Sequence, residues 1–313
     1  MEIQPWLISC IVLDIGVIGT NVGQQLIISS KWKDLDRIDH LLLSLSITDL
    51  LSGITTLTDD IYVLVDVMTV PNNSSRQCYK NNTQPYCILV KFMDSIILFS
   101  IFSALCHALA IAVERIYAIR FPFQYRSFSS NSVRCCTFLA IWTSSAVLTT
   151  VFYVALTFIR IPSAPWNLDR KIGAYLRGSV LVLLISIILT LYLFIIYFLF
   201  HQRSKIRQDF IPASQLRNRL IRQTLLCVFI GLTLVICLAP RTFAYLNPNL
   251  YHPVSNILLS LNSMCNSCVY YFKWWYDRKD VASKTKIVLL DCPASLTNSK
   301  DREDYSCPPS TTL

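Results

Sequence analysis

Seven long apolar segments constrain this chain more than any other feature of its sequence. A helix needs roughly 20 largely apolar residues to cross about 30 Å of bilayer hydrocarbon. Only 15% of the 313 residues are charged and the mean hydropathy is +0.47, whereas soluble domains carry about 25% charged residues. We therefore predict an all-α membrane protein, with a seven-transmembrane helix bundle in residues 1–275 and a cytoplasmic tail in 276–313. The predicted spans cover about 6–28, 39–65, 88–118, 134–158, 174–200, 222–245 and 254–275.

The distribution of basic residues predicts how the bundle is inserted. The chain has 28 Lys and Arg against 19 Asp and Glu, a net charge of +9. Most of the basic residues fall in the connections, helix ends and tail that are cytoplasmic if the N-terminus lies outside. Positive charge in short loops favours the cytoplasmic side, so we predict the N-terminus outside and the C-terminus inside. This placement accounts for the charge without nucleic acid as a partner.

The loop predicted after the second span carries two signals for the outer side. Asn72, Asn73 and Asn81 each begin an Asn-X-Ser/Thr sequon for N-glycosylation. Cys78 and Cys87 lie in the same loop, and the oxidising exterior favours disulfides. A bond between them would close a loop of about ten residues, worth roughly 2–3 kcal/mol. We predict glycans on this loop and a disulfide between Cys78 and Cys87.

Three features follow the seventh span. Residues 273–290 are amphipathic and predict a short helix along the inner membrane face, in contact with lipid. Cys292 comes directly after it and is a candidate for palmitoylation. The polar tail ends in Thr311-Thr312-Leu313, which fits a PDZ-domain ligand whose free carboxylate and Leu dock by strand addition.

Polar residues inside the apolar segments follow a recognisable order. Ionisable and amide groups are expensive in hydrocarbon, so each needs a partner or a water-filled cavity and is a functional candidate. Their order and spacing resemble those of the rhodopsin-like (class A) G-protein-coupled receptors over nearly the whole seven-helix region. The fragments that carry this resemblance are Gly19-Thr20-Asn21, Leu43-Ser44-Leu45 with Asp49-Leu50-Leu51, Glu114-Arg115-Ile116-Tyr117 with Pro122 and Tyr125, Trp142, Tyr192, Leu238-Ala239-Pro240, and Leu261-Asn262-Ser263 with Asn266 and Tyr270.

The resemblance implies a plasma-membrane receptor, not an enzyme, that passes binding of an extracellular ligand to a heterotrimeric G protein. In the family, the acid before the third-helix arginine holds that arginine at rest, and activation frees it to receive the G protein. By resemblance, the residues of coupling and activation are Glu114, Arg115, Tyr117, Tyr192, Pro240, Asn266 and Tyr270.

A second set of matching residues forms the family's central polar core, which holds water and a sodium ion. The matching residues are Asp49, Asn262, Ser263 and Asn266. The resemblance implies a possible Na⁺ at Asp49, and a hydrogen-bond network without an ion is the alternative.

The sequence departs from the family pattern at several positions. Leu238 replaces the aromatic residue before the sixth-helix proline, Ser267 replaces the seventh-helix proline, and Ala104 replaces a sodium-site hydroxyl. The inner start of the sixth helix has no acid and carries Arg217, Arg219 and Arg222 instead. Residues 159–173, the second outer loop, lack the cysteine that in the family usually forms a disulfide with the third helix. These changes argue against an aromatic switch, strong sodium regulation and a tight resting lock.

The ligand class is constrained mainly by what is missing. Ser260 stands where visual pigments carry the retinal-binding lysine, so no retinal is expected, and Ile97 stands where amine receptors place an Asp. Asp59, Asp94 and a fifth helix without proline resemble melanocortin receptors and their adenosine, cannabinoid and lysophospholipid relatives. In melanocortin receptors three acids bind calcium and a ligand arginine, but Val90 stands at the third position here, so no metal site is certain.

Asp59 and Asp94 are our candidate ligand-binding residues. Both are expected in the outer half of the bundle, where two neighbouring carboxylates repel and bind either a proton or a cation. A cationic or peptide ligand would satisfy them. The alternative is that Lys91, three residues before Asp94 on the same helix face, neutralises Asp94 as a structural pair.

Other classes of membrane protein remain as rivals. A transporter or channel could use the intramembrane acids, but transporters predict paired interrupted helices and an internal repeat, and the sequence shows neither. An intramembrane metal hydrolase needs clustered ligands, whereas the four His residues are scattered over different segments.

Overall fold

The structure is a computed structural model that describes residues 5–30, 37–69, 85–121, 124–125, 131–158, 166–205, 212–246 and 253–291. Side chains at several helix ends within these ranges, among them those of 85–88 and 279–291, are outside the description. The described residues form seven helices. They are α1 (Pro5–Ser30), α2 (Arg37–Thr69), α3 (Pro85–Arg120), α5 (Asn131–Phe158), α6 (Trp166–Lys205), α7 (Pro212–Leu246) and α8 (Pro253–Asp291).

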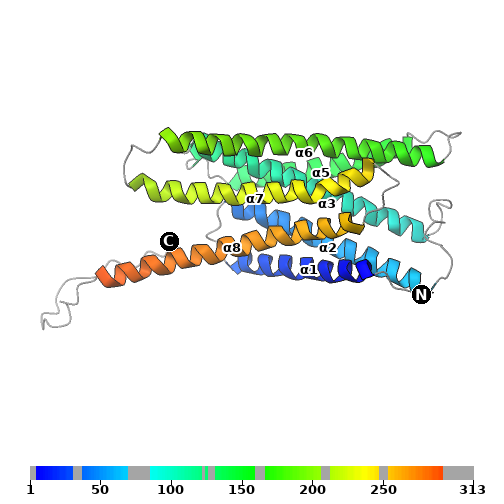
Figure 1. The fold of residues 1–313 in the computed structure, drawn as a ribbon, viewed down its shortest axis with the longest axis horizontal. Helices are drawn as coiled ribbons and strands as arrows, with labels where there is room; N and C mark the ends of the chain where they lie inside the picture. Colours follow the sequence, from blue (N-terminus) through cyan, green and yellow to red (C-terminus); the bar gives the residue numbers. More distant parts are fainter. Residues whose placement is uncertain are drawn as a thin grey trace, which may run out of the picture.

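The helices lie side by side with their long axes roughly aligned, and they alternate in direction (Figure 1). Neighbours in sequence pack together, and α8 closes the bundle by packing against α1, α2 and α7. Helix α3 is the central element because it contacts α2, α5, α6 and α7. Residues on α3 can therefore meet side chains from most of the bundle.

Six of the described helices are long and apolar enough to span a membrane, namely α1, α2, α3, α5, α6 and α7. Helix α8 does not reach this limit, because its first half carries the polar residues Asn262, Ser263, Asn266 and Ser267 and its second half is largely polar. These four side chains are all buried, so they face neighbouring helices rather than lipid. A polar α8 is thus compatible with a bundle whose interior satisfies those groups.

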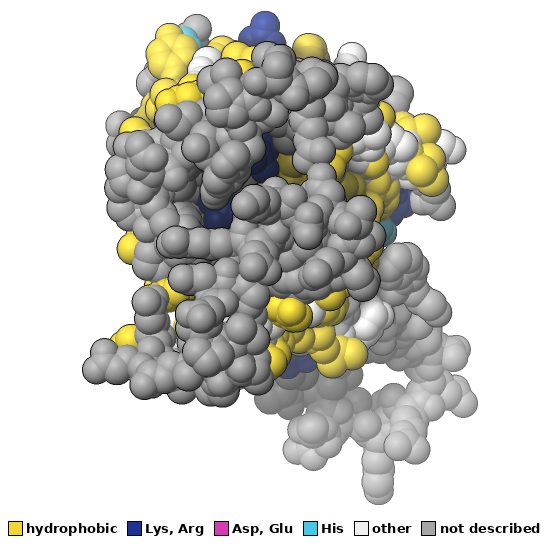
Figure 2. All heavy atoms as spheres, turned by 90° about the vertical axis from the view of Figure 1, so that its right-hand side faces the viewer, with side chains coloured by type: hydrophobic (Ala, Val, Ile, Leu, Met, Phe, Trp, Pro, Cys, Tyr) yellow, Lys and Arg dark blue, Asp and Glu magenta, His cyan; other side chains and the backbone are white. Residues whose placement is uncertain are grey.

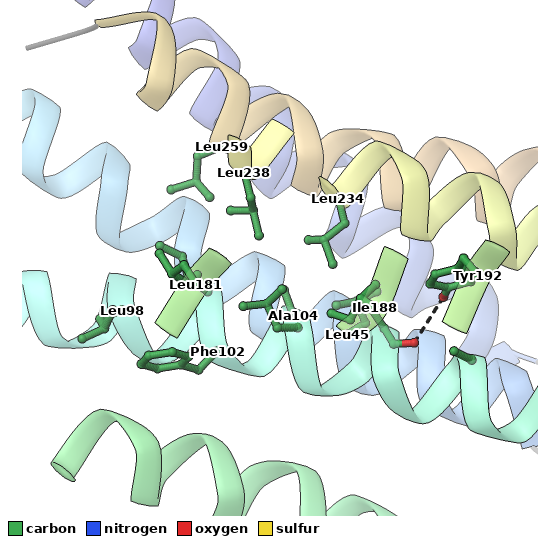
Figure 3. Close-up of a cluster of buried hydrophobic side chains, with 14 of the residues drawn as sticks. Leu45, Leu98, Phe102, Ala104, Leu181, Ile188, Tyr192, Leu234, Leu238 and Leu259 are labelled. Atoms are coloured by element: carbon green, nitrogen blue, oxygen red, sulfur yellow. Dashed lines mark hydrogen bonds between the residues drawn. The ribbon is translucent and has the colours of Figure 1, made fainter. Parts of the chain in front are cut away.

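The larger buried cluster is built mainly from α3, α6 and α7, with single buried residues from α2, α5 and α8. Phe102 stacks on Phe152 of α5 with ring centroids 5.3 Å apart. Leu238, the residue in place of the expected aromatic, is fully buried in this cluster, and Figure 3 shows it beside Leu259 and facing α3. An aliphatic side chain fills this position, so no aromatic ring is there to switch.

The separate short helix that the sequence predicts after the seventh span is not seen. Helix α8 continues without a break to Asp291 and extends past the other helices at one end of the bundle (Figure 1). Sharp helix kinks almost always arise at proline, at glycine or serine pairs, or at bulges. Residues 254–291 contain no proline or glycine, so nothing in the local sequence ends the helix.

Candidate functional site

The bundle has a polar site at each end and a polar core between them. Following the predicted insertion, we call the end where α1 begins the outer end and the opposite one the inner end. Figure 2 looks onto the outer end, where Lys and Arg side chains are visible in a hollow.

Beneath that end lies the outer cavity, which encloses about 430 Å³ including its open mouth. It is lined by residues of α1, α2, α3, α7 and α8. These are Cys10, Asp14, Thr56, Asp59, Asp60, Asp94, Ile97, Leu259, Arg241, Asn256 and Ser260. Four carboxylates and one guanidinium therefore face a single space.

The two predicted ligand-binding acids both line this cavity. Asp94 is exposed at its mouth and Asp59 is half-buried, and their charges act on each other. The cations that act most strongly on the Asp94 carboxylate are Arg241 and Arg177, and Arg241 acts on Asp59 as well. Arg241 of α7, which lines the same cavity, is thus an opposite charge near these acids that the sequence analysis did not identify.

Two further acids are more fully buried and were not among the predicted ligand residues. Asp14 of α1 is 1% exposed and accepts a hydrogen bond of 2.6 Å from the Ser260 hydroxyl of α8. Asp60 of α2 is also buried, and the charges of Asp14 and Asp59 both act on it. The sequence does contain a signal for these two acids, because Asp60 follows the candidate Asp59 directly and Asp14 is a charged residue in an apolar span.

The central polar core joins α2 to α8. Both Asp49 oxygens are engaged: Ser263 donates to one across 2.8 Å and the Asn266 amide donates to the other across 3.0 Å. The side-chain oxygens of Asn262 and Asn266 have no hydrogen-bond partner among the described residues. The structure therefore brings Ser263 and Asn266 onto Asp49, while Asn262 is buried on the same helix with no hydrogen bond to Asp49 among the described side chains.

A neighbouring cluster around Ser44 was missed. The Trp142 indole donates to the Ser44 hydroxyl across 2.9 Å, and the His107 Nε2 atom lies 2.9 Å from the same hydroxyl. His107 is fully buried, and its Nδ1 atom lies 2.7 Å from the Ser103 carbonyl. One serine thus connects α2, α3 and α5, and the helix-internal position of His107 in an apolar run was the available signal.

The inner site is built around Arg115 at the end of α3. This side chain is 2% exposed and donates to the Glu114 carboxylate across 3.0 Å. It also donates to the Tyr125 hydroxyl and to the Gln223 amide oxygen of α7, each across 3.3 Å. Gln223 was not predicted, and it offers a neutral acceptor in the inner half of α7. The family resemblance led us to look for an acid at the inner end of this helix.

Tyr125 completes this network from outside the span. Its hydroxyl donates to Glu114 across 2.5 Å, and the Arg37 guanidinium lies 5.0 Å from its ring centroid. Burial, followed by the Glu114 charge, raises the pKa of Tyr125 above its ordinary value. The hydroxyl therefore stays protonated and keeps donating to the carboxylate.

Two of the remaining predicted activation residues lie inside the bundle. Tyr192 of α6 is 1% exposed and donates to the Ala108 carbonyl of α3 across 3.2 Å, the bond drawn in Figure 3. Its ring packs directly on Gly231 of α7, where any added Cβ atom would overlap it. Tyr270 is buried beside a small inner cavity that Gln223 and Lys273 also line, and Lys273 forms an ion pair with Asp39.

The other two predicted activation residues occupy different settings. Tyr117 is half-buried, and its hydroxyl donates to Gln124 across 3.4 Å. Pro240 lies within α7.

Several predicted sites lie outside the described residues or side chains. They are the sequon residues Asn72, Asn73 and Asn81, the cysteines Cys78, Cys87 and Cys292, the basic residues Arg217 and Arg219, and the chain end 311–313.

Comparison with known protein families identifies the family to which the chain belongs. The family described as 7 transmembrane receptor (rhodopsin family) matches residues 26–271. The chain therefore belongs to the rhodopsin-like G-protein-coupled receptors, non-enzymatic multi-pass proteins of the plasma membrane that signal through heterotrimeric G proteins. Comparison with curated proteins found no match. The transporter and hydrolase alternatives are thereby set aside.

Proposed function

We propose that this receptor is activated by an extracellular ligand with a positively charged group, which Asp59 and Asp94 bind in the outer cavity. The observation that carries the proposal is the charge of that cavity, where four carboxylates face one guanidinium. Carboxylates that share a site repel, and a cation relieves that repulsion. An incoming cation would compete with Arg241 for both acids.

The resemblance to melanocortin receptors supports the same kind of ligand. Two of that group's three acidic positions are present as Asp59 and Asp94, while Val90 replaces the third. We therefore propose that the ligand's own charge, rather than a bound calcium ion, engages the acids.

The inner network supports a resting state that Glu114 and Tyr125 hold together around Arg115. Charge-assisted hydrogen bonds are roughly twice as strong as neutral ones, so the Glu114 contact is the strongest of the three that Arg115 makes. We propose that activation breaks this contact and turns Arg115 toward the G protein. Tyr117, Tyr192, Pro240, Asn266 and Tyr270 would accommodate the movement of α6, α7 and α8.

Sodium binding at Asp49 stays a prediction. In its favour, the buried side-chain oxygens of Asn262 and Asn266 are acceptors that a cation would satisfy. Ala104 supplies no hydroxyl, so we expect weak binding. Exchanging Na⁺ for a large organic cation should lower the melting temperature of the wild type and leave Asp49→Asn unchanged.

The remaining predictions concern the two faces of the membrane. We propose that the N-terminus and the glycosylated loop are outside, with Cys78 bonded to Cys87, and that the C-terminus is inside, with Cys292 palmitoylated and 311–313 recognised by a PDZ protein. The charge asymmetry and the sequons support this orientation. Non-reducing peptide mapping of surface protein should recover Cys78 and Cys87 joined.

The ligand proposal is tested with a second-messenger assay in transfected cells. Wild type is screened against cationic peptides, amines, nucleosides and lipids, and each active compound is repeated on Asp59→Asn and Asp94→Asn. Asp59 is half-buried, so Asp59→Asn should need at least tenfold more ligand, about 1.4 kcal/mol. Asp94 is exposed, so Asp94→Asn should have a smaller but measurable effect, of about 0.2–1 kcal/mol. Thr58→Ala, an exposed neighbour of Asp59, is the matched control. An agonist without positive charge, or one equally potent on both Asp variants, would contradict the proposal.

A further inference from the structure

The floor of the outer cavity holds a buried carboxylate with an unused oxygen. One Asp14 oxygen accepts the Ser260 hydroxyl, while the other, Oδ2, has no hydrogen-bond partner among the described residues. The side chain is 1% exposed and lines the cavity. An unsatisfied buried acceptor costs about 1–3 kcal/mol, and more when it is charged. The free Asp14 oxygen can therefore accept a hydrogen bond from a donor that enters the cavity.

A second acid faces the same floor from α2. Asp60 is buried, lines the same cavity and carries a charge on which Asp14 acts directly. Cys10, one helical turn before Asp14, lies near enough to both for their charges to act on it. Two carboxylates from different helices thus line the same cavity and act on each other.

The two acid pairs differ in their surroundings. Arg241 acts on both Asp59 and Asp94, and it donates to Asn256 across 2.6 Å. The strongest influences on Asp14 and Asp60 are, apart from burial, hydroxyl groups and other acids. Asp59 and Asp94 therefore already face a cation. Asp14 and Asp60 instead face each other and the hydroxyl groups of Ser260 and Thr56.

We infer that Asp14, Asp60 and Ser260 form a second subsite, which takes an ammonium group that lies deeper than the one held by Asp59 and Asp94. The ligand is then a dication, with two positive groups separated along the cavity. This inference rests on the proposed function, because it places a second charge of the same ligand in the same cavity. An ammonium has three donors, enough for the free Asp14 oxygen, Asp60 and the Ser260 oxygen.

The depth of Asp14 follows from helix geometry. Its partner Ser260 lies three residues before Ser263, which bonds Asp49, and Asp59 lies ten residues after Asp49. At about 1.5 Å per residue, Ser260 is roughly 5 Å and Asp59 roughly 15 Å outward of the polar core. Asp14 and Ser260 therefore lie nearer the polar core than Asp59 does, whereas Asp60, which follows Asp59 directly on α2, lies at about the same level as Asp59.

Linear diamines and matched monoamines test this directly. The full chain is purified in lipid nanodiscs, and its melting temperature is measured against 1-aminoalkanes and α,ω-diaminoalkanes of rising chain length. In wild type, diamines of intermediate length should bind at least tenfold more tightly than the monoamine of equal length. Asp14→Asn keeps the side-chain shape and should remove this advantage while leaving monoamine binding intact. Asp60→Asn gives the same test if Asp14→Asn does not fold, and Thr58→Ala is the control.

The outcomes separate the inference from the proposed function. If Asp59→Asn weakens all amines, but diamines bind wild type no better than monoamines, the second subsite is refuted and the cationic site stands. Stabilisation by NaCl or CaCl₂ that depends on Asp14, with no diamine advantage, would also refute it. If no amine stabilises the wild type, or Asp59→Asn has no effect on any of them, the proposed cationic site itself fails.

Discussion

The Ser267 hydroxyl donates a 2.9 Å hydrogen bond to the side-chain oxygen of Asn21, joining α8 to α1 inside the bundle. Ser267 stands where the family pattern has a proline, which could not make this bond. The Asn21 amide in turn donates to the Val17 carbonyl of its own helix across 2.9 Å. A hydroxyl bond between helices thus stands where a proline kink is expected, and α8 passes this point as a continuous helix.

Removing that hydroxyl should weaken the bundle. Ser267 is 0% exposed, so Ser267→Ala leaves the Asn21 oxygen buried without its donor, at a cost of about 1–3 kcal/mol. We expect a lower melting temperature of purified receptor. Ser186→Ala is the control, because Ser186 is exposed and bonds only its own helix. Equal melting of the two variants would show that the bond contributes nothing.

The packing of Tyr192 on Gly231 predicts a second stability effect. A methyl group at 231 would overlap the ring, and overpacking typically costs about 1–3 kcal/mol. Gly231→Ala should therefore lower the melting temperature and weaken the Tyr192 bond to Ala108, and adding Tyr192→Leu should recover part of the loss. Gly19→Ala meets nothing within 4 Å and should be neutral or stabilising, since Ala favours helix by about 1 kcal/mol. Equal melting of both Gly variants would contradict this packing.

Tyr125 is predicted to hold the resting state through its bond to Glu114. Tyr125→Phe keeps the ring and removes only the hydroxyl, so Glu114 loses a short hydrogen bond and Arg115 a partner. We expect ligand-free signalling to rise at least twofold in a second-messenger assay at equal surface expression. Tyr197→Phe, an exposed tyrosine of α6, is the comparison. Unchanged or reduced basal signalling in Tyr125→Phe would mean that the resting contact lies elsewhere.

The predicted orientation has its own test in the outer loop. Glycosidase treatment of surface protein should increase its gel mobility, and replacing Asn72, Asn73 and Asn81 by Gln should abolish the shift. The sequons can be modified only on the outer side. A wild type without glycans at the cell surface would remove this support for an outer loop at 66–87.

The fold could be read from the sequence because membrane spans have a strong signal. Apolar length sets each span, and the predicted limits of α1, α2, α3 and α5 fall within four residues of the described helices. Helices α6 and α7 begin eight and ten residues before the predicted spans, because their polar first turns carry no apolar signal. The end of α8 could not be predicted in the same way. The amphipathic stretch after residue 275 suggested a separate helix, but no proline or glycine interrupts the backbone, and the chain continues to Asp291.

The site was predictable where single residues carry the signal. Asp59 and Asp94 stood out as charges in apolar segments, and the structure places both on one cavity. The sequence could not show which side chains from other helices lie next to each acid. Arg241 lies on α7 and Ser260 on α8, and their approach to the acids depends on how distant helices pack. Gln223 was missed because an uncharged amide in a basic segment gives no signal in the sequence.

The most direct test of the account is nucleotide exchange on a purified heterotrimeric G protein by receptor in nanodiscs. Arg115→Ala is compared with wild type and with Arg120→Ala, an exposed arginine five residues later at the same end of α3. Arg115→Ala should reach the cell surface yet lose at least 90% of receptor-dependent exchange. A tenfold loss of exchange rate corresponds to a rise of about 1.4 kcal/mol in the activation barrier. Arg120→Ala should exchange nearly as wild type. Undiminished exchange by Arg115→Ala would contradict the role proposed for the inner site.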